Sequence, residues 1–174
     1  LSEPRLISAV CGGLRVASVY APNGREVDAP HFHAKLHWYG ALRAWSAERI
    51  AQPAPLLLGG DFNVAPTDAD VWDPAALVGA THVTPRERDA WNALVDLGLI
   101  DAAQAVAPDG ECAPFTWWDY RGGAFHRGWG MRIDHLLVEP RAGAIVSSSV
   151  DRDGRKGESP SDHAALMIDV ARPA

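Results

Sequence analysis

The sequence has few cysteines and no long hydrophobic run, and each shortage excludes a class of protein. Among its 174 residues are two cysteines, Cys11 and Cys112, whose spacing fits neither a metal site nor a redox motif. We therefore expect reduced thiols and a cytoplasmic location. No apolar run approaches the roughly 20 residues that cross a bilayer, and no signal peptide opens the chain, so we expect no membrane partner.

The sequence also lacks an excess of positive charge. Its 16 Lys and Arg residues against 22 Asp and Glu residues give a net charge of −6, which counts against a nucleic-acid partner. Positive charge is nevertheless concentrated in two places, the stretch 121–132, which contains no acidic residue, and the stretch 152–156. A local basic strip can bind phosphates while the rest of the surface stays acidic, so charge alone leaves the partner open.

What is present indicates one packed domain over residues 1–174, because 47% of the residues are hydrophobic and seven are Trp. The patterns predict a mixed α/β fold. A hairpin is expected over 6–10 and 14–20, and a glycine-rich loop over 122–130. One helix is expected over 32–48, and a second from a Thr84–Glu87 capping box to Gly98. Further strands are expected over 56–58, 115–120, 131–138, 145–150 and 164–170.

Asp61 and Asn63 stand where the short strand at 56–58 runs into a glycine pair. Side chains two residues apart on extended backbone point the same way, so both could face one cleft. A carboxylate can bind a hard metal ion or activate water, and an amide can hold that water or a phosphate oxygen. A turn in which both side chains bond to the backbone explains the pair equally well.

A second polar group lies at Asp134 and at the consecutive residues Ser161, Asp162 and His163. Consecutive residues do not form a serine triad, because triads are assembled from distant positions. His163 needs a distant carboxylate to orient it, and Asp134 is the best candidate, which would leave Asp162 free to face a metal ion. The simpler alternatives are an Asp134 paired with Arg132 and a solvated His163.

The stretch 115–134 alternates aromatic, basic and glycine residues, "FTWWDYRGGAFHRGWGMRID". This composition suits stacking on bases or sugars together with pairing to phosphates. An aromatic core strand followed by a loop is the alternative, and it fits whichever of Trp117 and Trp118 points inward.

Taken together, "VYAPNG", "GGDFNVAPTDADV", "TPRERDAWNALVDLGLIDA", "FTWWDYRGGAF", "GMRIDHLL" and "SPSDHA" resemble the successive motifs of the exodeoxyribonuclease III family of abasic-site endonucleases. This family is part of the endonuclease/exonuclease/phosphatase superfamily. The resemblance covers essentially the whole chain. It implies an α/β fold, part of a four-layer sandwich in which two mixed sheets pack face to face between helices.

The resemblance also implies roles for individual residues. Asp61 would activate the attacking water beside Asn63, and His163, oriented by Asp134, would contact the scissile phosphate together with Tyr20. Mg²⁺, or Mn²⁺ in its place, would be held by Asp61, Asn63, Asp162 and His163. The residues expected to contact DNA, including those around the base-less sugar, are Asn23, Arg25, Trp117, Trp118, Arg121, Met131 and Ile133, with Trp129 as a further wall residue.

The activity implied is Mg²⁺-dependent incision of double-stranded DNA 5′ to abasic sites, with 3′-5′ exonuclease or 3′-phosphatase activity, by a monomer. The family's first strands, which end in "WN" and "Q-E" and carry its main metal-binding Glu, do not appear in this sequence. We therefore expect the C-terminal two-thirds of the family's domain, weak or inactive by itself. A non-catalytic DNA-binding module and a lipid- or inositol-phosphate phosphoesterase are the two alternatives.

Overall fold

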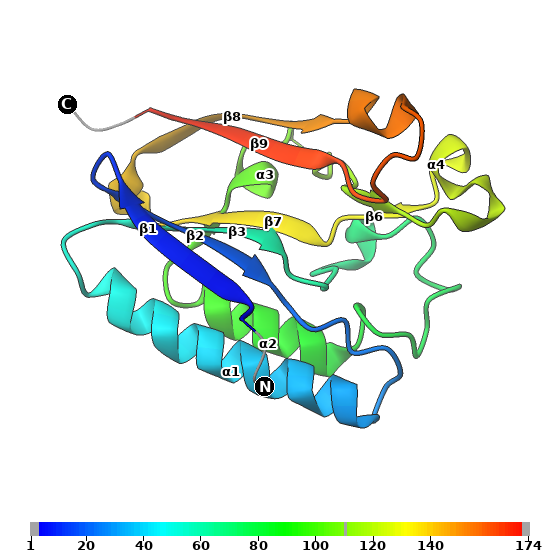
Figure 1. Ribbon diagram of the computed structural model, residues 1–174, viewed down its shortest axis with the longest axis horizontal. Coiled ribbons are helices and arrows are strands. Elements are labelled where there is room, and N and C mark those ends of the chain that lie inside the picture. The colour runs from blue at the N-terminus through cyan, green and yellow to red at the C-terminus, as the bar shows by residue number, and fades with distance from the viewer. Residues whose placement is uncertain (1–3, 110, 172–174) are drawn as a thin grey trace.

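The computed structural model describes residues 4–109 and 111–171, and its largest element is a mixed five-stranded sheet (Figure 1). The strands lie in the order β1-β2-β3-β7-β4, with β2 and β3 parallel and the other pairs antiparallel. Their bounds are Leu6–Cys11 for β1, Leu14–Tyr20 for β2, Leu56–Asp61 for β3, Ile100–Asp101 for β4 and Asp134–Val138 for β7.

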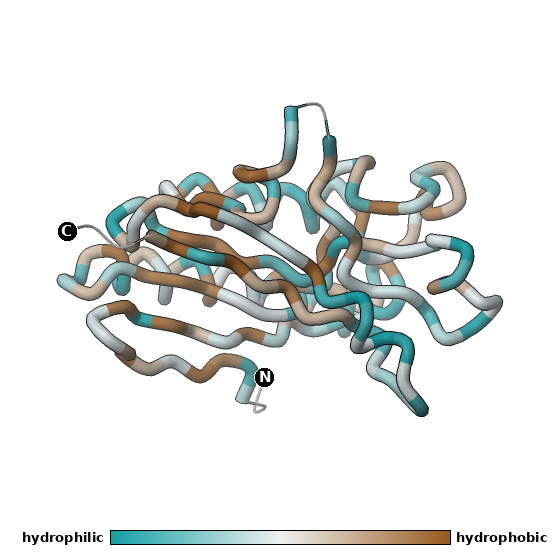
Figure 2. Tube along the Cα trace, turned by 90° about the horizontal axis from the view of Figure 1, so that it is seen from above, coloured by the Kyte–Doolittle hydropathy of each residue, from teal (hydrophilic) through white to brown (hydrophobic). Residues whose placement is uncertain are grey.

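Two packed helices, α1 (Pro30–Ile50) and α2 (Pro85–Val95), cover one face of this sheet (Figure 1). The expected capping box is confirmed, because the Thr84 and Glu87 side chains each bind the other residue's backbone N–H. The core between helices and sheet contains Ala17, Val19, Tyr39, Leu42, Leu56, Leu58, Phe62, Trp91, Leu94 and Leu137. Figure 2 shows that hydrophobic residues recur along the strands, while the connecting loops are mostly hydrophilic.

A second, antiparallel sheet of β8 (Ala144–Asp151) and β9 (Ala165–Ala171) lies on the opposite side of the large sheet (Figure 1). The short helix α3 (Ala102–Ala105) packs against both β7 and β8. Side chains of both sheets meet there in one apolar cluster: Leu57, Ala102, Leu136, Val138, Ile145 and Ile168. The expected α/β fold with two packed sheets is therefore confirmed.

The stretch 115–138 differs from the expected pair of long strands. The ladder contains only β5 (Trp117–Trp118) and β6 (Gly130–Met131), which pair with each other, and β7 begins three residues later in the large sheet. The break occurs because the Arg132 backbone N–H donates to the Asp70 carbonyl instead of continuing the ladder. The expected glycine-rich loop contains a helical turn, α4 (Ala124–Arg127).

Four 3₁₀ turns complete the described elements: η1 (Asp68–Asp70), η2 (Arg121–Gly123), η3 (Pro140–Ala142) and η4 (Asp153–Lys156). Both cysteines are free thiols, as expected, and both are exposed. In the two described ranges, no helix is both long enough and apolar enough to cross a membrane.

Candidate active site

Three polar side chains lie side by side where adjacent strands of the large sheet end or begin. The register pairs Tyr20 of β2 with Asp61 of β3, and Asp61 with Asp134 of β7. The parallel strands β2 and β3 both end at this edge of the sheet, and the antiparallel strand β7 begins there. Residues that are distant from Asp61 in sequence thus become its direct neighbours.

Asp61 and Asn63 form a closely bonded pair after β3. The two Asp61 carboxylate oxygens accept hydrogen bonds from the Asn63 backbone N–H and from its side-chain Nδ2, both at 2.8 Å. Asn63 has a left-handed backbone, with φ of 52°, and is 2% exposed. The sequence offered a shared cleft or a backbone-bonded turn, and the geometry is a turn in which the two side chains also face each other.

Gly60 makes this arrangement compatible with the sheet. Its φ is +140°, and a Cβ atom at this position would lie 2.0 Å from the Val19 carbonyl oxygen. Only glycine can therefore bring β3 this close to β2 just before Asp61.

The Asp61 carboxyl lies in an environment that disfavours its charge. Burial and the neighbouring charge of Asp134 raise the pKa of Asp61 to about 6, against the opposing effects of the Asn63 hydrogen bond, His163 and Lys35. Asp61 is thus largely ionised at neutral pH, yet its pKa is close to that pH. A carboxylate with such a pKa is suited to accept a proton from water.

His163 is bound to Asp134, as expected. Its Nδ1 lies 2.8 Å from Asp134 Oδ2, and the Thr116 hydroxyl oxygen accepts from the Asp134 backbone N–H and so fixes the start of β7. Burial opposes the charged form of His163, but the hydrogen bond and charge of Asp134, with the charges of Asp61 and Asp162, outweigh it and raise its pKa. The alternative pairing of Asp134 with Arg132 is wrong, because Arg132 binds Asp70 and Asp101.

Asp162 was expected to be free to face a metal ion, but its Oδ2 accepts a hydrogen bond of 2.9 Å from Trp117 Nε1. Mg²⁺ requires about six oxygen ligands in octahedral geometry. Within residues 4–109 and 111–171, no group of three or more His, Cys, Asp or Glu side chains could hold a metal ion. The residues expected to bind Mg²⁺ or Mn²⁺ therefore do not form a cage made of protein ligands alone, and waters and substrate phosphates would have to supply most of the six ligands.

The loop after β2 reaches the same site. Asn23 Nδ2 donates to Asn63 Oδ1 at 3.1 Å, and Arg25 is exposed with a left-handed backbone. The Tyr20 ring is exposed, with the Arg5 guanidinium 5.1 Å from its centre. Together these side chains line a pocket of about 260 Å³ beside the strand ends.

The residues expected to surround a sugar divide into two sets. Trp117, Met131 and Ile133 do belong to one apolar cluster, in which Trp117 is half-buried and the other two are almost fully buried. Trp118 is 0% exposed, so the expectation that it contacts DNA is corrected: it is the inward-pointing Trp of β5. Trp129 stacks on Trp72 at 4.8 Å between ring centres.

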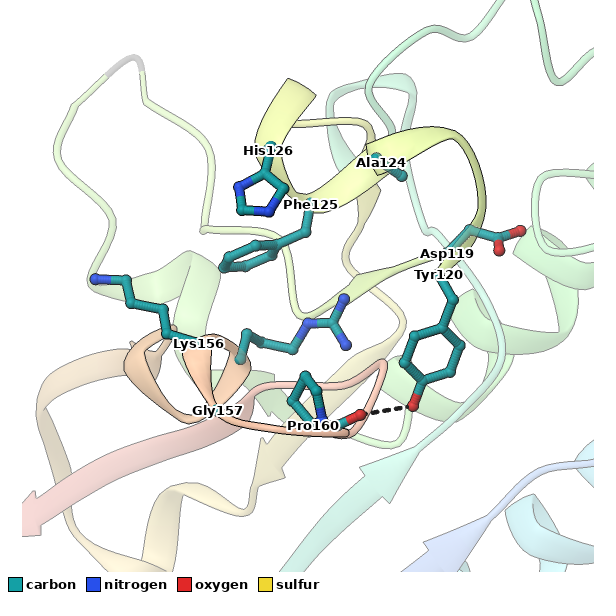
Figure 3. A pocket seen from close by; sticks show the side chains of 10 residues that line it. Asp119, Tyr120, Ala124, Phe125, His126, Lys156, Gly157 and Pro160 are labelled. Atoms are coloured by element: carbon teal, nitrogen blue, oxygen red, sulfur yellow. Dashed lines mark hydrogen bonds between the residues drawn. The ribbon is translucent and has the colours of Figure 1, made fainter.

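The two basic stretches meet around a pocket of about 360 Å³ (Figure 3). Arg121 is exposed nearby and ion-paired with Asp119. Arg132 is buried and does not belong to this surface. The stretch 121–132 was expected to be basic along its length, so Arg132 is a correction to that expectation. Arg155 is also buried, and it donates to the Ser161 and Trp118 carbonyls. Tyr120 donates to the Pro160 carbonyl, drawn as a dashed line in Figure 3.

Sequence reasoning missed a polar group behind Asn63, formed by the buried Lys35 and Glu87 and the half-buried His82. In the helix expected over 32–48, the polar residues Lys35 and Ser46 are buried beside Phe32, Tyr39 and Leu42. The positions 35, 39, 42 and 46 follow helical spacing and so lie on one face of the helix. A Lys on that buried face could have indicated a buried polar contact.

Comparison with known proteins agrees with this geometry. The model of the Endonuclease/Exonuclease/phosphatase family matches residues 3–163. An exodeoxyribonuclease from Bacillus subtilis is 33% identical over 87% of this chain and 59% of its own length. The chain spans about three fifths of the length of this relative and of an exodeoxyribonuclease III from Haemophilus influenzae, which is 32% identical to it.

Two solved structures have the same fold. A 3′ phosphatase (NExo) from Neisseria, bound to a product DNA hairpin, is 40% identical with a TM-score of 0.93, over 98% of this chain and 66% of its own. An AP endonuclease from Archaeoglobus fulgidus is 32% identical with a TM-score of 0.89, over 95% and 65% of the two chains. The resemblance carried by the six sequence motifs is thereby confirmed, and the chain belongs to the Endonuclease/Exonuclease/phosphatase family.

Proposed function

We propose that this chain carries the water-activating and phosphate-binding side chains of a DNA-repair phosphodiesterase that cleaves duplex DNA 5′ to abasic sites, with 3′-5′ exonuclease and 3′-phosphatase activity. One observation supports this most directly: Tyr20, Asp61 and Asp134 are aligned across three strands, with His163 bound to Asp134. Relatives and structural neighbours named as exodeoxyribonuclease, AP endonuclease and 3′ phosphatase support the same activities.

The chemistry assigns one task to each side chain. Asp61 accepts a proton from the water that attacks phosphorus, and the Asn63 amide orients that water. The P–O3′ bond breaks, and the leaving oxygen takes a proton from solvent. His163, kept protonated by Asp134, donates a hydrogen bond to a phosphate oxygen as charge develops on it. Tyr20 donates to the same phosphate from the neighbouring strand.

The proposed substrate is double-stranded DNA, held by Asn23, Arg25 and Arg121 along the backbone and by Trp117, Met131 and Ile133 at the base-less sugar. An abasic nucleotide leaves the helix at a lower cost than a paired base, which favours its selection. We propose that residues 1–174 form one domain that acts as a monomer in the cytoplasm. The proposed cofactor is Mg²⁺, with Mn²⁺ as the alternative. Asp61, Asn63, Asp162 and His163 would supply part of its ligands.

A non-catalytic DNA-binding module is the second candidate, and the absence of a metal-binding cluster among the described residues favours it. The two candidates differ in what Asp61 does. An enzyme needs the Asp61 carboxylate for cleavage, whereas a module binds abasic DNA equally well before and after the substitution Asp61→Asn.

The test uses a labelled duplex with one abasic site, a 3′-recessed duplex and a 3′-phosphate duplex, each with and without Mg²⁺. We expect cleavage that is lost in Asp61→Asn and in His163→Gln but kept in Asp153→Asn, a matched control at an exposed Asp. Binding without cleavage in the wild-type chain, unchanged in Asp61→Asn, would support the module instead. A lipid- or inositol-phosphate substrate that turns over faster than DNA would overturn the proposal.

A further inference from the structure

The backbone carbonyl of Asn63 is held by two side chains from outside the active-site strands, the buried Lys35 and the half-buried His82. Lys35 Nζ, from α1, lies 2.5 Å from this oxygen, and His82 Nδ1 lies 2.6 Å from it. Both groups donate, so the two lone pairs of the carbonyl oxygen are occupied.

Glu87 orders both donors. It forms an ion pair with Lys35 in which both side chains are 0% exposed. The Glu87 oxygen that contacts Lys35, Oε1, also accepts hydrogen bonds from the Thr81 hydroxyl at 2.8 Å and from the His82 backbone N–H at 2.9 Å. The other oxygen belongs to the capping box with Thr84. Glu87 therefore joins α2, the segment before it and α1 at one point behind Asn63.

Stability alone does not explain a buried Lys at this position. Removing two charges from water is costly, and replacing buried ion pairs with apolar residues is often neutral or stabilising. The remaining positions of the same stripe of α1 are filled by Phe32, Tyr39 and Leu42, with a small Ser46. A Leu or Met would continue that stripe, so the ammonium group is explained by what it contacts.

What it contacts is a residue in the left-handed backbone conformation, with φ of 52°. Asn adopts this conformation more readily than most non-glycine residues, but it still competes with the extended and right-handed forms, so contacts that favour it help to decide which form is populated. In this conformation the Asn63 side chain bonds Asp61, the Ala21 carbonyl and Asn23 simultaneously. If the backbone relaxed to an extended or right-handed form, the amide would turn away from Asp61.

We propose that Lys35, oriented by Glu87 and assisted by His82, is a positioning residue that holds Asn63 in its left-handed conformation and so keeps the Asn63 amide against Asp61. Lys35 does not touch the reacting atoms itself. Its effect on hydrolysis rests on the proposed function, whereas its effect on the geometry of Asn63 does not.

The experiment records the Asn63 side-chain NH₂ signals by NMR in ¹⁵N-labelled protein, assigned with Asn63→Ala. In Lys35→Met we expect these signals to shift, and the Asn63 backbone N–H to exchange with solvent about tenfold faster. If the wild-type chain cleaves DNA, kcat should fall about 10- to 100-fold with KM little changed, because a small misplacement of a reacting group has effects of that size.

Leu42→Ala is the matched control, because it removes a buried side chain from the same helix without touching Asn63. It should lower the unfolding midpoint while the Asn63 signals and kcat keep their wild-type values. His82→Phe removes the second donor to the Asn63 carbonyl and leaves the Lys35–Glu87 ion pair intact. It replaces Lys35→Met as the test variant if that variant does not fold.

Wild-type Asn63 signals and exchange in the folded Lys35 and His82 variants would overturn the proposal. So would equal changes in Leu42→Ala. An inactive wild-type chain would count against the proposed function only, since the NMR result is independent of cleavage.

Discussion

Acidification should destabilise this protein through His135, which is buried in the strand beside the candidate site. His135 Nε2 donates to the Val64 carbonyl at 2.9 Å, and its Nδ1 accepts from Arg132 Nη1 at 3.0 Å. Burial and the Arg132 charge lower the pKa of His135 to about 4, against the opposing effects of Asp101, the Val64 hydrogen bond and Asp70. The ring is therefore neutral in the folded protein.

The sign and size of this change in the free energy of unfolding follow from proton linkage. An unfolded His has a pKa near 6.5, so between about pH 4 and 6.5 the unfolded chain binds more protons than the folded one. The free energy of unfolding then falls as pH falls, at up to about 1.4 kcal/mol per pH unit. With a folded pKa of about 4, the loss from His135 alone is about 1.3 kcal/mol between pH 7.5 and 5.5.

The assay is urea unfolding, followed by Trp fluorescence at pH 7.5 and 5.5, of the wild type and His135→Gln. Gln can accept from Arg132 and donate to Val64, but it does not titrate. The stability lost on acidification should be about 1.3 kcal/mol smaller in His135→Gln. The exposed His37→Gln is the control and should leave that loss unchanged. Equal acid losses in wild type and His135→Gln would refute the reasoning.

Three further predictions concern the backbone, a buried ion pair and the site. Gly60→Ala should destabilise the protein by more than about 3 kcal/mol, or prevent folding, because the added methyl meets the Val19 carbonyl; a urea midpoint within error of wild type contradicts this. Arg132→Met should cost about 3–5 kcal/mol in urea unfolding, since Asp70 and Asp101 lose their buried partner, whereas Arg121→Met, at an exposed ion pair, should leave the urea midpoint within error of wild type. Any cleavage of abasic DNA should fall about tenfold per pH unit below about pH 6, because Asp61 becomes protonated; a rate independent of pH between about 5 and 7 would exclude Asp61 as the base.

Local sequence signals predicted most elements of the large sheet and its helices. The apolar runs of β1 and β2, the capping box of α2 and the helical spacing of α1 depend on neighbours within a few residues, so they can be read along the chain. The polar pair Asp61 and Asn63 was visible for the same reason. The split of 131–138 into β6 and β7 was not, because it depends on a hydrogen bond from Arg132 to Asp70, 62 positions away.

The sequence by itself determined which residue types could do chemistry, and the resemblance of its motifs proposed their roles. Only the tertiary structure decided which of those residues meet. In the tertiary structure Trp118 lies in the core and Trp117 donates a hydrogen bond to Asp162. The strand register places Tyr20, Asp61 and Asp134 next to one another. The physical reason is that alternation along a strand defines two faces, whereas the covering of each face and the neighbours of each strand end depend on segments distant in sequence. Lys35 shows this most clearly, because its burial depends on Glu87 and on the Asn63 carbonyl.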